Sequence, residues 1–269
     1  MEFLIEKVWK INNPVNIVDF GCGLGFMGIM LLPLLPKGST YTGIDANKTL
    51  LSKAENIFKD SPYKTNFVKK DLTEYIPEKK YDIAVCHTVL QHISNPKKIL
   101  EKMKDSVIDG GRVICVEIDT ITAIAAQYFH GIRQSEILNL TNYQKQVEIN
   151  EIENDIHDGH IGMKVPVFMQ ESGLKDIDVR VNDYVQFINP MGDKNKHEND
   201  VKSYMANPWA KKPGDKKSSI AWFMDKGYTE KEAEEQYNHQ VAKYEYINKN
   251  INHDYILNAR CLFISCGTV

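Results

Sequence analysis

The chain of 269 residues is long enough for one large domain, or for a core domain with a substantial insertion, and either can bury a full hydrophobic core. With 33 basic and 36 acidic residues its formal charge is only −3, so it provides no global field for gathering nucleic acid. No apolar run approaches the ~20 residues of a membrane span, and the N-terminal stretch contains acidic residues and no signal-peptide cleavage site. We therefore expect a cytoplasmic globular protein.

The five cysteines are scattered along the chain and odd in number. Cys86, Cys115, Cys261 and Cys266 lie in or beside expected strands, where a free cysteine behaves as a small apolar side chain. Cys22 differs because it falls in a glycine-rich turn. The pattern predicts reduced thiols rather than a disulfide framework, and it lacks the companion ligands that a zinc site needs.

The first part of the chain is expected to form a helix, a strand, a glycine turn, a helix and a strand. Residues 2–11 place apolar side chains at helical spacing, and residues 15–20 are a β-branched run that ends at the turn. Residues 26–35 are almost wholly apolar and long enough for a helix, and residues 40–44 are a second strand that ends on Asp45. This order predicts a nucleotide-binding βαβ unit, in which Asp45 at the strand tip can take both ribose hydroxyls.

One glycine spacing in this unit fits a dinucleotide site. Gly23, Gly25 and Gly28 match the G-x-G-x-x-G fingerprint, and Asp45 follows at about the expected distance along the chain. A lone glycine fingerprint is weak evidence. An oxidoreductase that binds a nicotinamide dinucleotide therefore stays open as an alternative.

A second spacing overlaps the first and includes a carboxylate. Gly21, Gly23 and Gly25 match G-x-G-x-G, and Asp19 precedes them by two residues. A dinucleotide would place its pyrophosphate on the turn and the helix N-terminus, where Asp19 would oppose the ligand's charge. S-adenosylmethionine places an ammonium group there, which a carboxylate favours. Residues 18–25 thus resemble motif I of the class I S-adenosylmethionine-dependent methyltransferases.

The resemblance implies S-adenosyl-L-methionine as cofactor and S-adenosyl-L-homocysteine as its product. It also implies that an upstream segment common in the family is missing, because the first expected strand begins so near the start of the chain. The cofactor-binding residues that it implies in this region are Asp19, Gly21, Cys22, Gly23, Gly25, Asp45 and Ala46.

The next elements bring a further acidic residue to the same edge of the sheet. Asn47 is suited to cap a helix over residues 48–58, and residues 64–69 follow as the third strand. Asp71 and Leu72 come just past that strand. In the family, an Asp at this place accepts a hydrogen bond from the adenine amino group, and its neighbour packs against the ring. The alternative for Asp71 is a helix cap or a solvated turn.

The fourth strand is expected over residues 81–86, and a helix over residues 96–105 opens on a proline. The phrase Tyr81–Pro96 resembles motif IV of the small-molecule methyltransferases, including the ubiquinone and menaquinone methylating type. The resemblance implies that His87 touches the methionine part of the cofactor, and a histidine often stands where His92 does. A purely structural histidine is the alternative at both positions.

The end of the chain distinguishes two folds. Asp109-Gly110-Gly111 is expected to form a turn before a fifth strand over residues 112–118, and residues 164–173 resemble the family's last helix. Residues 174–185 are predicted to be the sixth strand, and residues 255–265 the last. In class I methyltransferases the last strand inserts antiparallel beside the sixth, a feature that dinucleotide dehydrogenases lack. The expected fold is therefore α/β: a Rossmann-like seven-stranded sheet, mostly parallel with the last strand antiparallel, with helices on both faces and a helical cap.

Two stretches exceed this minimal fold. The core is expected to comprise residues 1–119, 162–187 and 255–269, and the insertions residues 120–161 and 188–254. Structureless connections of such length are rare in compact domains, so both insertions should be folded. We expect them to form a helical cap that encloses a small-molecule methyl acceptor.

The second insertion contains a well-marked helix. Thr229 and Glu232 form a capping box, and an apolar stripe follows it at three- and four-residue spacing. The stripe, expected to pack inside the protein, consists of Ala233, Tyr237, Val241 and Tyr244.

The most basic local run lies between Lys194 and Lys217, interleaved with Tyr204 and Trp209. A basic and aromatic surface can bind RNA. A solvated lysine face explains the run as well, and the acidic stretch at residues 230–235 weakens its field. An RNA methyltransferase acting on tRNA is therefore kept as an alternative, and the small-molecule acceptor is preferred.

The expected reaction transfers a methyl group from the sulfonium sulfur to an oxygen, nitrogen or carbon nucleophile, and it requires no metal. Because the donor is already activated, the protein mainly supplies alignment, a site closed to water and, for some acceptors, proton removal. His130 ranks first as the catalytic proton acceptor because it follows Tyr128-Phe129. The other candidates are Tyr128, His157, His160, Glu117 and Asp119. A non-catalytic protein that binds S-adenosylmethionine remains the third alternative.

Overall fold

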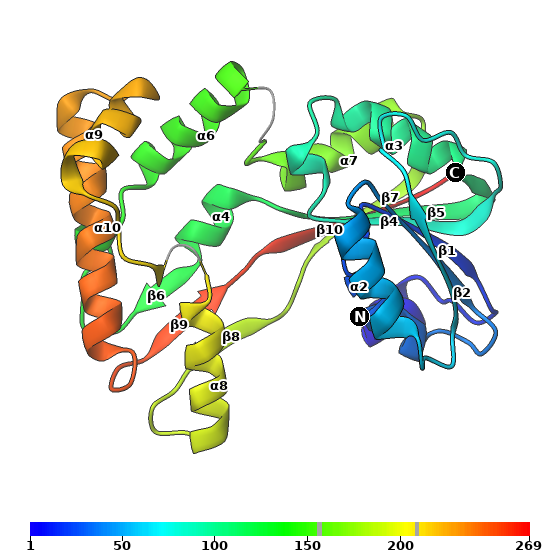
Figure 1. The fold of residues 1–269 in the computed structure, drawn as a ribbon, viewed down its shortest axis with the longest axis horizontal. Coiled ribbons are helices and arrows are strands. Elements are labelled where there is room, and N and C mark those ends of the chain that lie inside the picture. The colour runs from blue at the N-terminus through cyan, green and yellow to red at the C-terminus, as the bar shows by residue number, and fades with distance from the viewer. Residues whose placement is uncertain (155–157, 208–209) are drawn as a thin grey trace. The chain divides into compact units, whose positions relative to one another are not determined.

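A computed structural model describes residues 1–154, 158–207 and 210–269, without the side chains of residues 146 and 149–154. The chain divides into two compact units (Figure 1). The first unit comprises Met1–Ile118, Ile161–Val181 and Leu262–Val269. The second comprises Asp119–His160 and Asn182–Cys261.

The first unit is built on a seven-stranded sheet in the order β3-β2-β1-β4-β5-β10-β7. Neighbouring strands from β3 to β5 are parallel, and β10 runs antiparallel to both β5 and β7. This topology confirms the predicted mostly parallel sheet with an antiparallel last strand. The strands are β1 (Asn16–Phe20), β2 (Thr40–Asp45), β3 (Lys64–Lys69), β4 (Tyr81–His87), β5 (Val107–Ile118), β7 (Lys175–Val181) and β10 (Leu262–Thr268).

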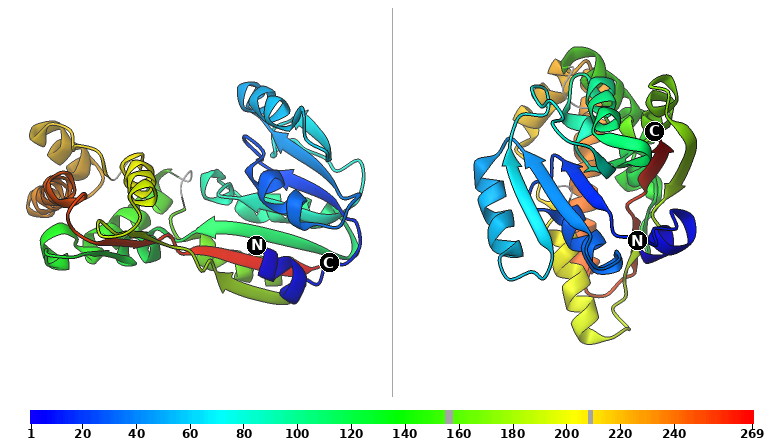
Figure 2. Two further views of the ribbon diagram at one scale, coloured as in Figure 1. Left: turned by 90° about the horizontal axis from the view of Figure 1, so that it is seen from below. Right: turned by 90° about the vertical axis from the view of Figure 1, so that its right-hand side faces the viewer.

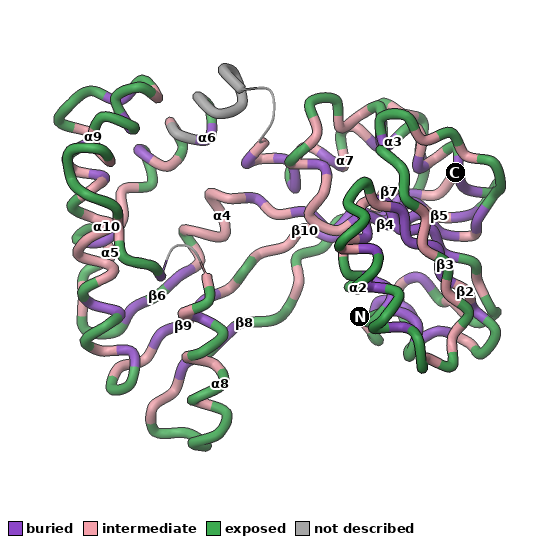
Figure 3. Tube along the Cα trace, in the orientation of Figure 1, coloured by how far each residue is buried: buried purple, intermediate pink, exposed green. Residues whose placement is uncertain are grey.

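Helices cover both faces of this sheet (Figure 2). They are η1 (Leu4–Val8), α1 (Phe26–Leu31), η2 (Leu32–Leu34), α2 (Lys48–Phe58), η3 (Leu90–His92), α3 (Pro96–Asp105) and α7 (Ile161–Glu171). One apolar cluster joins η1, α1 and α2 to the sheet through residues such as Met27 and Phe58. A second joins α3 and α7 through Met103 and Met169. The buried strands between these layers are the purple part of the sheet in Figure 3.

Helix starts follow the capping residues expected from the sequence. The Asn47 side chain accepts hydrogen bonds from the backbone N–H groups of Thr49 and Leu50 at the start of α2. α3 begins at Pro96, whose fixed φ suits a first helical turn, and the Asn95 side chain caps it. These caps fix the residues at which the loops after β2 and β4 end and the next helices begin.

The predicted turn at Asp109-Gly110-Gly111 is wrong, because these residues lie inside β5. The pairing with β4 shifts register across this segment, as in a β-bulge. Gly110 has a φ of +77°, which suits glycine in a bulge as well as in a turn. A Cβ on Gly111 would lie 2.6 Å from the Asp82 carbonyl oxygen.

Two predicted strands are each broken into two. The segment predicted as strand six ends at Val181 and continues as β8 (Val185–Ile188), which joins a different sheet. The predicted last strand is likewise split into β9 (Ile256–Ala259) and β10, and Cys261 between them has a φ of +49°. Each segment thus contributes one strand to each compact unit.

The second unit combines helices with a small antiparallel sheet in the order β6-β9-β8, where β6 is Gln127–Phe129. Its helices are α4 (Thr120–Ala125), α5 (Gln134–Ile137), α6 (Leu140–Asn154), α8 (Lys194–Met205), α9 (Lys216–Asp225) and α10 (Glu230–Asn250). The helices were expected from the sequence, whereas β6 was not, and β8 and β9 come from the segments that were predicted to be strands of the first sheet. The capping box of Thr229 and Glu232 at the start of α10 is confirmed. Within the described part of the chain, none of the helices has the length and apolar character needed to cross a membrane.

The contact between α7 and β5 gives a test of the fold. A Cβ on Gly162 would lie 2.9 Å from the carbonyl oxygens of Glu117 and Ile118, which cannot move without shifting β5. Replacing glycine by alanine at an uncrowded helix position stabilises the folded protein by about 1 kcal/mol. A loss of stability at Gly162 would therefore indicate a clash with β5. We expect Gly162→Ala to lower the free energy of unfolding in urea by about 1–3 kcal/mol.

The matched control is Met163→Ala, at the next and exposed position of α7. It should change the free energy of unfolding by less than about 0.5 kcal/mol. A Gly162→Ala protein more stable than wild type would contradict the close approach of α7 to β5.

Candidate functional site

The glycine turn between β1 and α1 is fastened to the end of β2. The backbone N–H groups of Gly21 and Cys22 both donate to the Ile44 carbonyl oxygen, at 2.8 and 2.9 Å. Gly21 has a φ of +74°, and a Cβ there would lie 2.6 Å from Cγ2 of Val89. By contrast, a Cβ on Gly23 would meet nothing within 4 Å among the described residues. The turn is therefore tightly packed at its base and open at Gly23.

Asp45, at the tip of β2, is oriented by two backbone amides. Its Oδ2 accepts a hydrogen bond from Gly23 N–H at 2.8 Å, and its Oδ1 accepts one from Asn47 N–H at 2.8 Å. Each carboxylate oxygen has a second lone pair beyond these bonds. Asp45 can therefore present two acceptors side by side to a vicinal diol while it braces the turn. Ala46, between Asp45 and Asn47, is exposed.

Asp19, near the end of β1, is buried beneath the glycine turn. Its Oδ2 accepts a hydrogen bond from the Tyr41 hydroxyl at 2.5 Å, whereas its Oδ1 has no hydrogen-bond partner among the described residues. Burial raises the pKa of Asp19 to about 7, with Asp45 adding to the effect and the Tyr41 hydrogen bond opposing it. A buried carboxylate oxygen without a partner is costly. A cationic ligand group would therefore be stabilised here. The neighbouring Cys22 thiol is also buried, which raises its pKa.

Asp71, just past β3, lies in an exposed turn. Its Oδ1 accepts hydrogen bonds from the Thr73 N–H at 2.8 Å and the Thr73 hydroxyl at 2.7 Å, and these bonds lower the pKa of Asp71. Lys102 binds the carbonyl oxygens of Leu72 and Thr73, which fixes the turn. Leu72 is buried in the cluster beneath α3. The contacts of Asp71 and Leu72 with adenine stay predictions.

His87 ends β4 at the same carboxyl edge. Its ring lies 5.1 Å from the ring of Phe26, the first residue of α1. Burial lowers the pKa of His87, which favours the neutral imidazole. Thr88, with a φ of +53°, turns the chain away from the strand. His92 lies exposed at the end of η3.

Glu117, near the end of β5, holds the segment that follows β4. Its Oε1 accepts hydrogen bonds from the backbone N–H groups of Val89 and Leu90, both at 3.0 Å. Its Oε2 has no partner among the described residues, and burial raises the pKa of Glu117 to about 7. Sequence reasoning named Glu117 only as a candidate base and missed this anchoring contact, because no local signal links residues so far apart.

His130 lies in the second unit, directly after β6. Its ring Nδ1 is 3.2 Å from the Tyr128 hydroxyl, and its ring lies 5.9 Å from that of Tyr255. The backbone carbonyl of His130 accepts a hydrogen bond from the Tyr246 hydroxyl. His130 is exposed, so its proposed catalytic role rests on its sequence position. His157 lies outside the described residues.

Asp119 and His160 meet in the second unit, where Nδ1 of His160 lies 2.7 Å from Oδ2 of Asp119. The sequence named both residues as separate candidates, but it gave no signal that they would be partners.

Three of the seven lysines in the basic run of the second unit are paired with acidic side chains among the described residues. Lys194 and Lys196 in α8 lie 3.9 and 2.9 Å from Glu198 and Asp200. Lys216 forms an ion pair with Glu234 at 2.6 Å. Trp209 lies outside the described residues. This pairing weakens the positive field that an RNA-binding surface needs.

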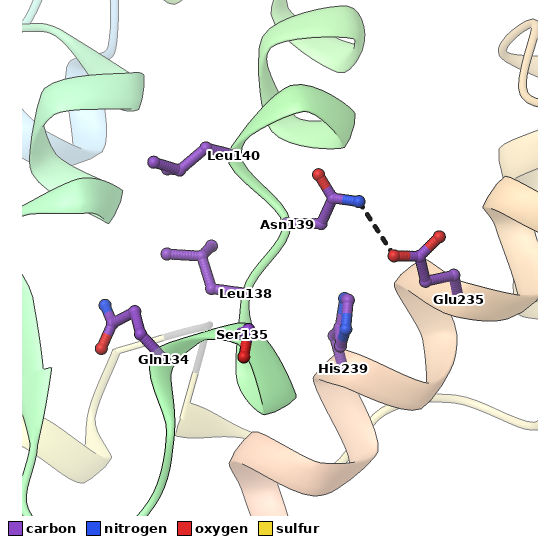
Figure 4. Close-up of a pocket in the computed structure, with 7 residues that line it drawn as sticks. All are labelled: Gln134, Ser135, Leu138, Asn139, Leu140, Glu235 and His239. Carbon is purple, nitrogen blue, oxygen red and sulfur yellow. Dashed lines mark hydrogen bonds between the residues drawn. The ribbon is translucent and has the colours of Figure 1, made fainter.

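A cavity of about 390 Å³ in the second unit lies between α10 and the segment from α5 to α6 (Figure 4). Two polar side chains around it are bonded within the unit: Asn139 donates to Glu235 at 2.9 Å, and Gln134 donates to the Gln127 carbonyl oxygen at 2.8 Å. Two leucines complete the wall. His239 also lines the cavity, and its buried Nδ1 has no hydrogen-bond partner among the described residues.

Comparisons with known proteins agree with the first unit's geometry. Residues 18–113 match the family described as "Methyltransferase domain". The chain is 28% identical over 173 residues to a ubiquinone biosynthesis O-methyltransferase of Rickettsia canadensis, covering 61% of this chain and 71% of that protein. The same enzyme of Rickettsia felis is 27% identical, with 61% and 68% covered.

Two solved structures share the fold. The YcgJ protein of Bacillus subtilis superposes with a TM-score of 0.53 at 11% identity, covering 99% of this chain and 97% of that one. Phosphoethanolamine N-methyltransferase 2 of Haemonchus contortus, solved with phosphomonomethylethanolamine and S-adenosylhomocysteine, gives 0.52 at 13% identity, covering 98% and 51%. The family match and the two relatives, taken with the glycine turn, its two flanking carboxylates and the strand order, support the expectation of a class I S-adenosylmethionine-dependent methyltransferase.

Proposed function

We propose that the protein transfers the methyl group of S-adenosylmethionine to a hydroxyl group of a small molecule. The observation that supports it most directly is the pair of carboxylates on the glycine turn, Asp19 beneath it and Asp45 bonded to Gly23. A pyrophosphate on this turn would be repelled by Asp19, whereas the ammonium group of S-adenosylmethionine would be favoured there, and Asp45 suits the ribose.

The residues around the turn would divide the recognition of the cofactor among them. Asp45 would accept hydrogen bonds from the ribose hydroxyls, and Asp19 would face the ammonium group with its unpartnered Oδ1. Gly21, Cys22, Gly23, Gly25 and Ala46 would line the ligand with backbone. Asp71 and Leu72 would meet the adenine, and His87 and His92 the methionine part.

The bound cofactor supplies a methyl group on a sulfonium sulfur whose positive charge disperses in the transition state. Apolar side chains suit that dispersal, and Leu24 and Phe26, next to the turn, are exposed in this structure. Phe26 also contacts the ring of His87, whose lowered pKa favours the neutral form, so these side chains next to the turn are uncharged. The chain's own task is therefore alignment and exclusion of water.

The hydroxyl acceptor is supported by the relatives in Rickettsia, which are O-methyltransferases. We further propose that the second unit forms the cap that selects the acceptor. The matched family region ends at residue 113, before that unit begins, so acceptor choice is expected to depend on residues that the family does not share. The cytoplasm is the proposed location, since the five cysteines are free thiols.

A cap that closes over the cofactor should lose mobility when the product binds. We expect S-adenosylhomocysteine to slow hydrogen exchange in residues 119–160 and 182–261, measured by mass spectrometry. Adenosine at the same concentration is the control, since it lacks the amino-acid part. Unchanged exchange in both stretches would contradict a cap.

Replacement of Asp45 tests the cofactor site. Charge-assisted hydrogen bonds are worth about 1.5–3 kcal/mol, so Asp45→Ala should weaken S-adenosylmethionine binding by about 10- to 100-fold in calorimetric titration. Asp45→Asn keeps an acceptor for Gly23 N–H and separates loss of charge from disruption of the turn.

The matched control is Asp60→Ala, an exposed residue just past α2, which should bind as wild type does. Binding of NADH instead of S-adenosylmethionine by the wild-type protein would overturn the proposed function.

The raised pKa of Asp19 predicts a pH dependence of stability. Its pKa is about 7 in the folded protein and 3.8 in the reference state, so the folded protein holds the proton more tightly between these values. The stabilisation is complete below pH 4 and is lost as the pH rises through 7, by an amount on the order of 4 kcal/mol. Wild type should therefore lose stability relative to Asp19→Asn over this window in urea unfolding. A constant difference between the two proteins from pH 4.5 to 8 would contradict a buried, titrating Asp19.

A further inference from the structure

Asp119 and His160 form a hydrogen-bonded pair that fixes the ring of the histidine. Asp119 is fully buried and caps α4, with Oδ1 accepting from the Thr122 N–H at 2.7 Å. Its Oδ2 lies 2.7 Å from Nδ1 of His160. Because a carboxylate accepts and cannot donate, Nδ1 must bear the hydrogen. The lone pair of the neutral ring is therefore on Nε2, and about a quarter of this side chain is exposed (25%).

The backbone around the pair is held from both sides. The Thr120 N–H donates to the Gly159 carbonyl oxygen at 2.8 Å, which fastens the two chain segments together. The His160 N–H donates to Oδ1 of Asp158 at 2.9 Å. A side chain at position 159 would be crowded, because a Cβ on Gly159 would lie 2.9 Å from Cγ1 and Cγ2 of Val147. The histidine is thus positioned by groups that are themselves fixed, as a proton-transfer site requires.

Covalent connection places this pair at the carboxyl end of β5. Asp119 directly follows Ile118, the last residue of β5, and His160 directly precedes Ile161, the first residue of α7. Consecutive Cα atoms lie ~3.8 Å apart. Open α/β sheets bind their ligands at the carboxyl ends of the strands. Both residues are therefore tethered to the ligand-binding edge.

We propose that His160, oriented by Asp119, removes the proton from the hydroxyl group of the methyl acceptor. This inference rests on the proposed function and names a group that performs it. The acceptor O–H bond breaks, an N–H bond forms at Nε2, and the electron pair stays on the oxygen that takes the methyl group. The Asp119 carboxylate stabilises the resulting imidazolium, which returns its proton to water. Asp119 is a positioning residue, and His160 the catalytic one.

The environment of the pair differs from that of the other candidates. The ring of His130 contacts the Tyr128 hydroxyl, a weaker orienting group than a carboxylate. Oε1 of Glu117 already accepts hydrogen bonds from two backbone amides, so this oxygen is occupied in holding the chain. Among the described residues, Asp158 and Cys261 are titratable groups that interact with the pair, and both burial and Asp119 raise the pKa of the Cys261 thiol.

The test compares two acceptors that differ in whether a base is needed. At pH 7.5 the hydroxyls of catechol are protonated, whereas 4-nitrocatechol is already largely ionised. With S-adenosylhomocysteine production as the readout, His160→Gln should slow catechol methylation by about 10²- to 10⁴-fold and 4-nitrocatechol methylation by less than about tenfold. Asp119→Asn should slow catechol less than His160→Gln does. His253→Gln, at an exposed histidine after α10, is the matched control and should keep wild-type rates.

A second readout needs neither cofactor nor acceptor. Nitrogen NMR shifts of the free wild-type protein should show the proton of neutral His160 on Nδ1, and Asp119→Asn should remove that preference. A proton on Nε2, equal slowing of both acceptors by His160→Gln, or loss of catechol turnover in His130→Gln alone would overturn the proposal. Cofactor binding without turnover of either acceptor by wild type would overturn the hydroxyl acceptor and the base together. Absence of cofactor binding would instead overturn the proposed function.

Discussion

The attachment of the glycine turn to the end of β2 determines most of this site. Gly21 and Cys22 both donate to the Ile44 carbonyl, and Gly23 donates to Asp45, so three successive amides fix the turn. The position of β2 is in turn set by Tyr41, whose ring stacks on Phe58 and whose hydroxyl binds Asp19. The two carboxylates of the site are therefore parts of one hydrogen-bonded system. A change in the packing of Tyr41 would reach both of them.

Buried carboxylates are kept in this fold for two different reasons. Glu117 accepts two backbone amides, which offsets the cost of removing its charge from water and holds the segment after β4. The second oxygen of each carboxylate is unpartnered among the described residues, but Asp19 receives one hydrogen bond, from the Tyr41 hydroxyl, against the two amides of Glu117. Buried polar groups are normally satisfied, so an exception needs a reason. Partial satisfaction is expected of a residue that completes its bonding with a ligand rather than with the protein.

The sequence predicted the features that are local or periodic. Glycine spacing identified the turn, Asn47 and Thr229 identified helix starts, and β-branched runs identified the strands of the core. The sheet β6-β9-β8 was missed because β6 has only three residues and pairs Phe129 with Ile256 across a long stretch of chain. The same limit hid the pairs Glu117 with Leu90 and Asp119 with His160. Hydrogen bonds between distant residues leave no periodic signal.

The boundary between the shared core and the second unit has a chemical meaning. The matched family region lies wholly within the first unit, whereas Asp119 and His160 are the two ends of the first inserted segment. The Thr120–Gly159 hydrogen bond that closes this segment is also what brings the two residues together. Closing a loop of this length costs entropy that its own packing must offset. If His160 is positioned only when the insertion folds, then proton removal from the methyl acceptor requires an intact insertion. The glycine turn that binds the cofactor lies in the first unit and does not depend on it.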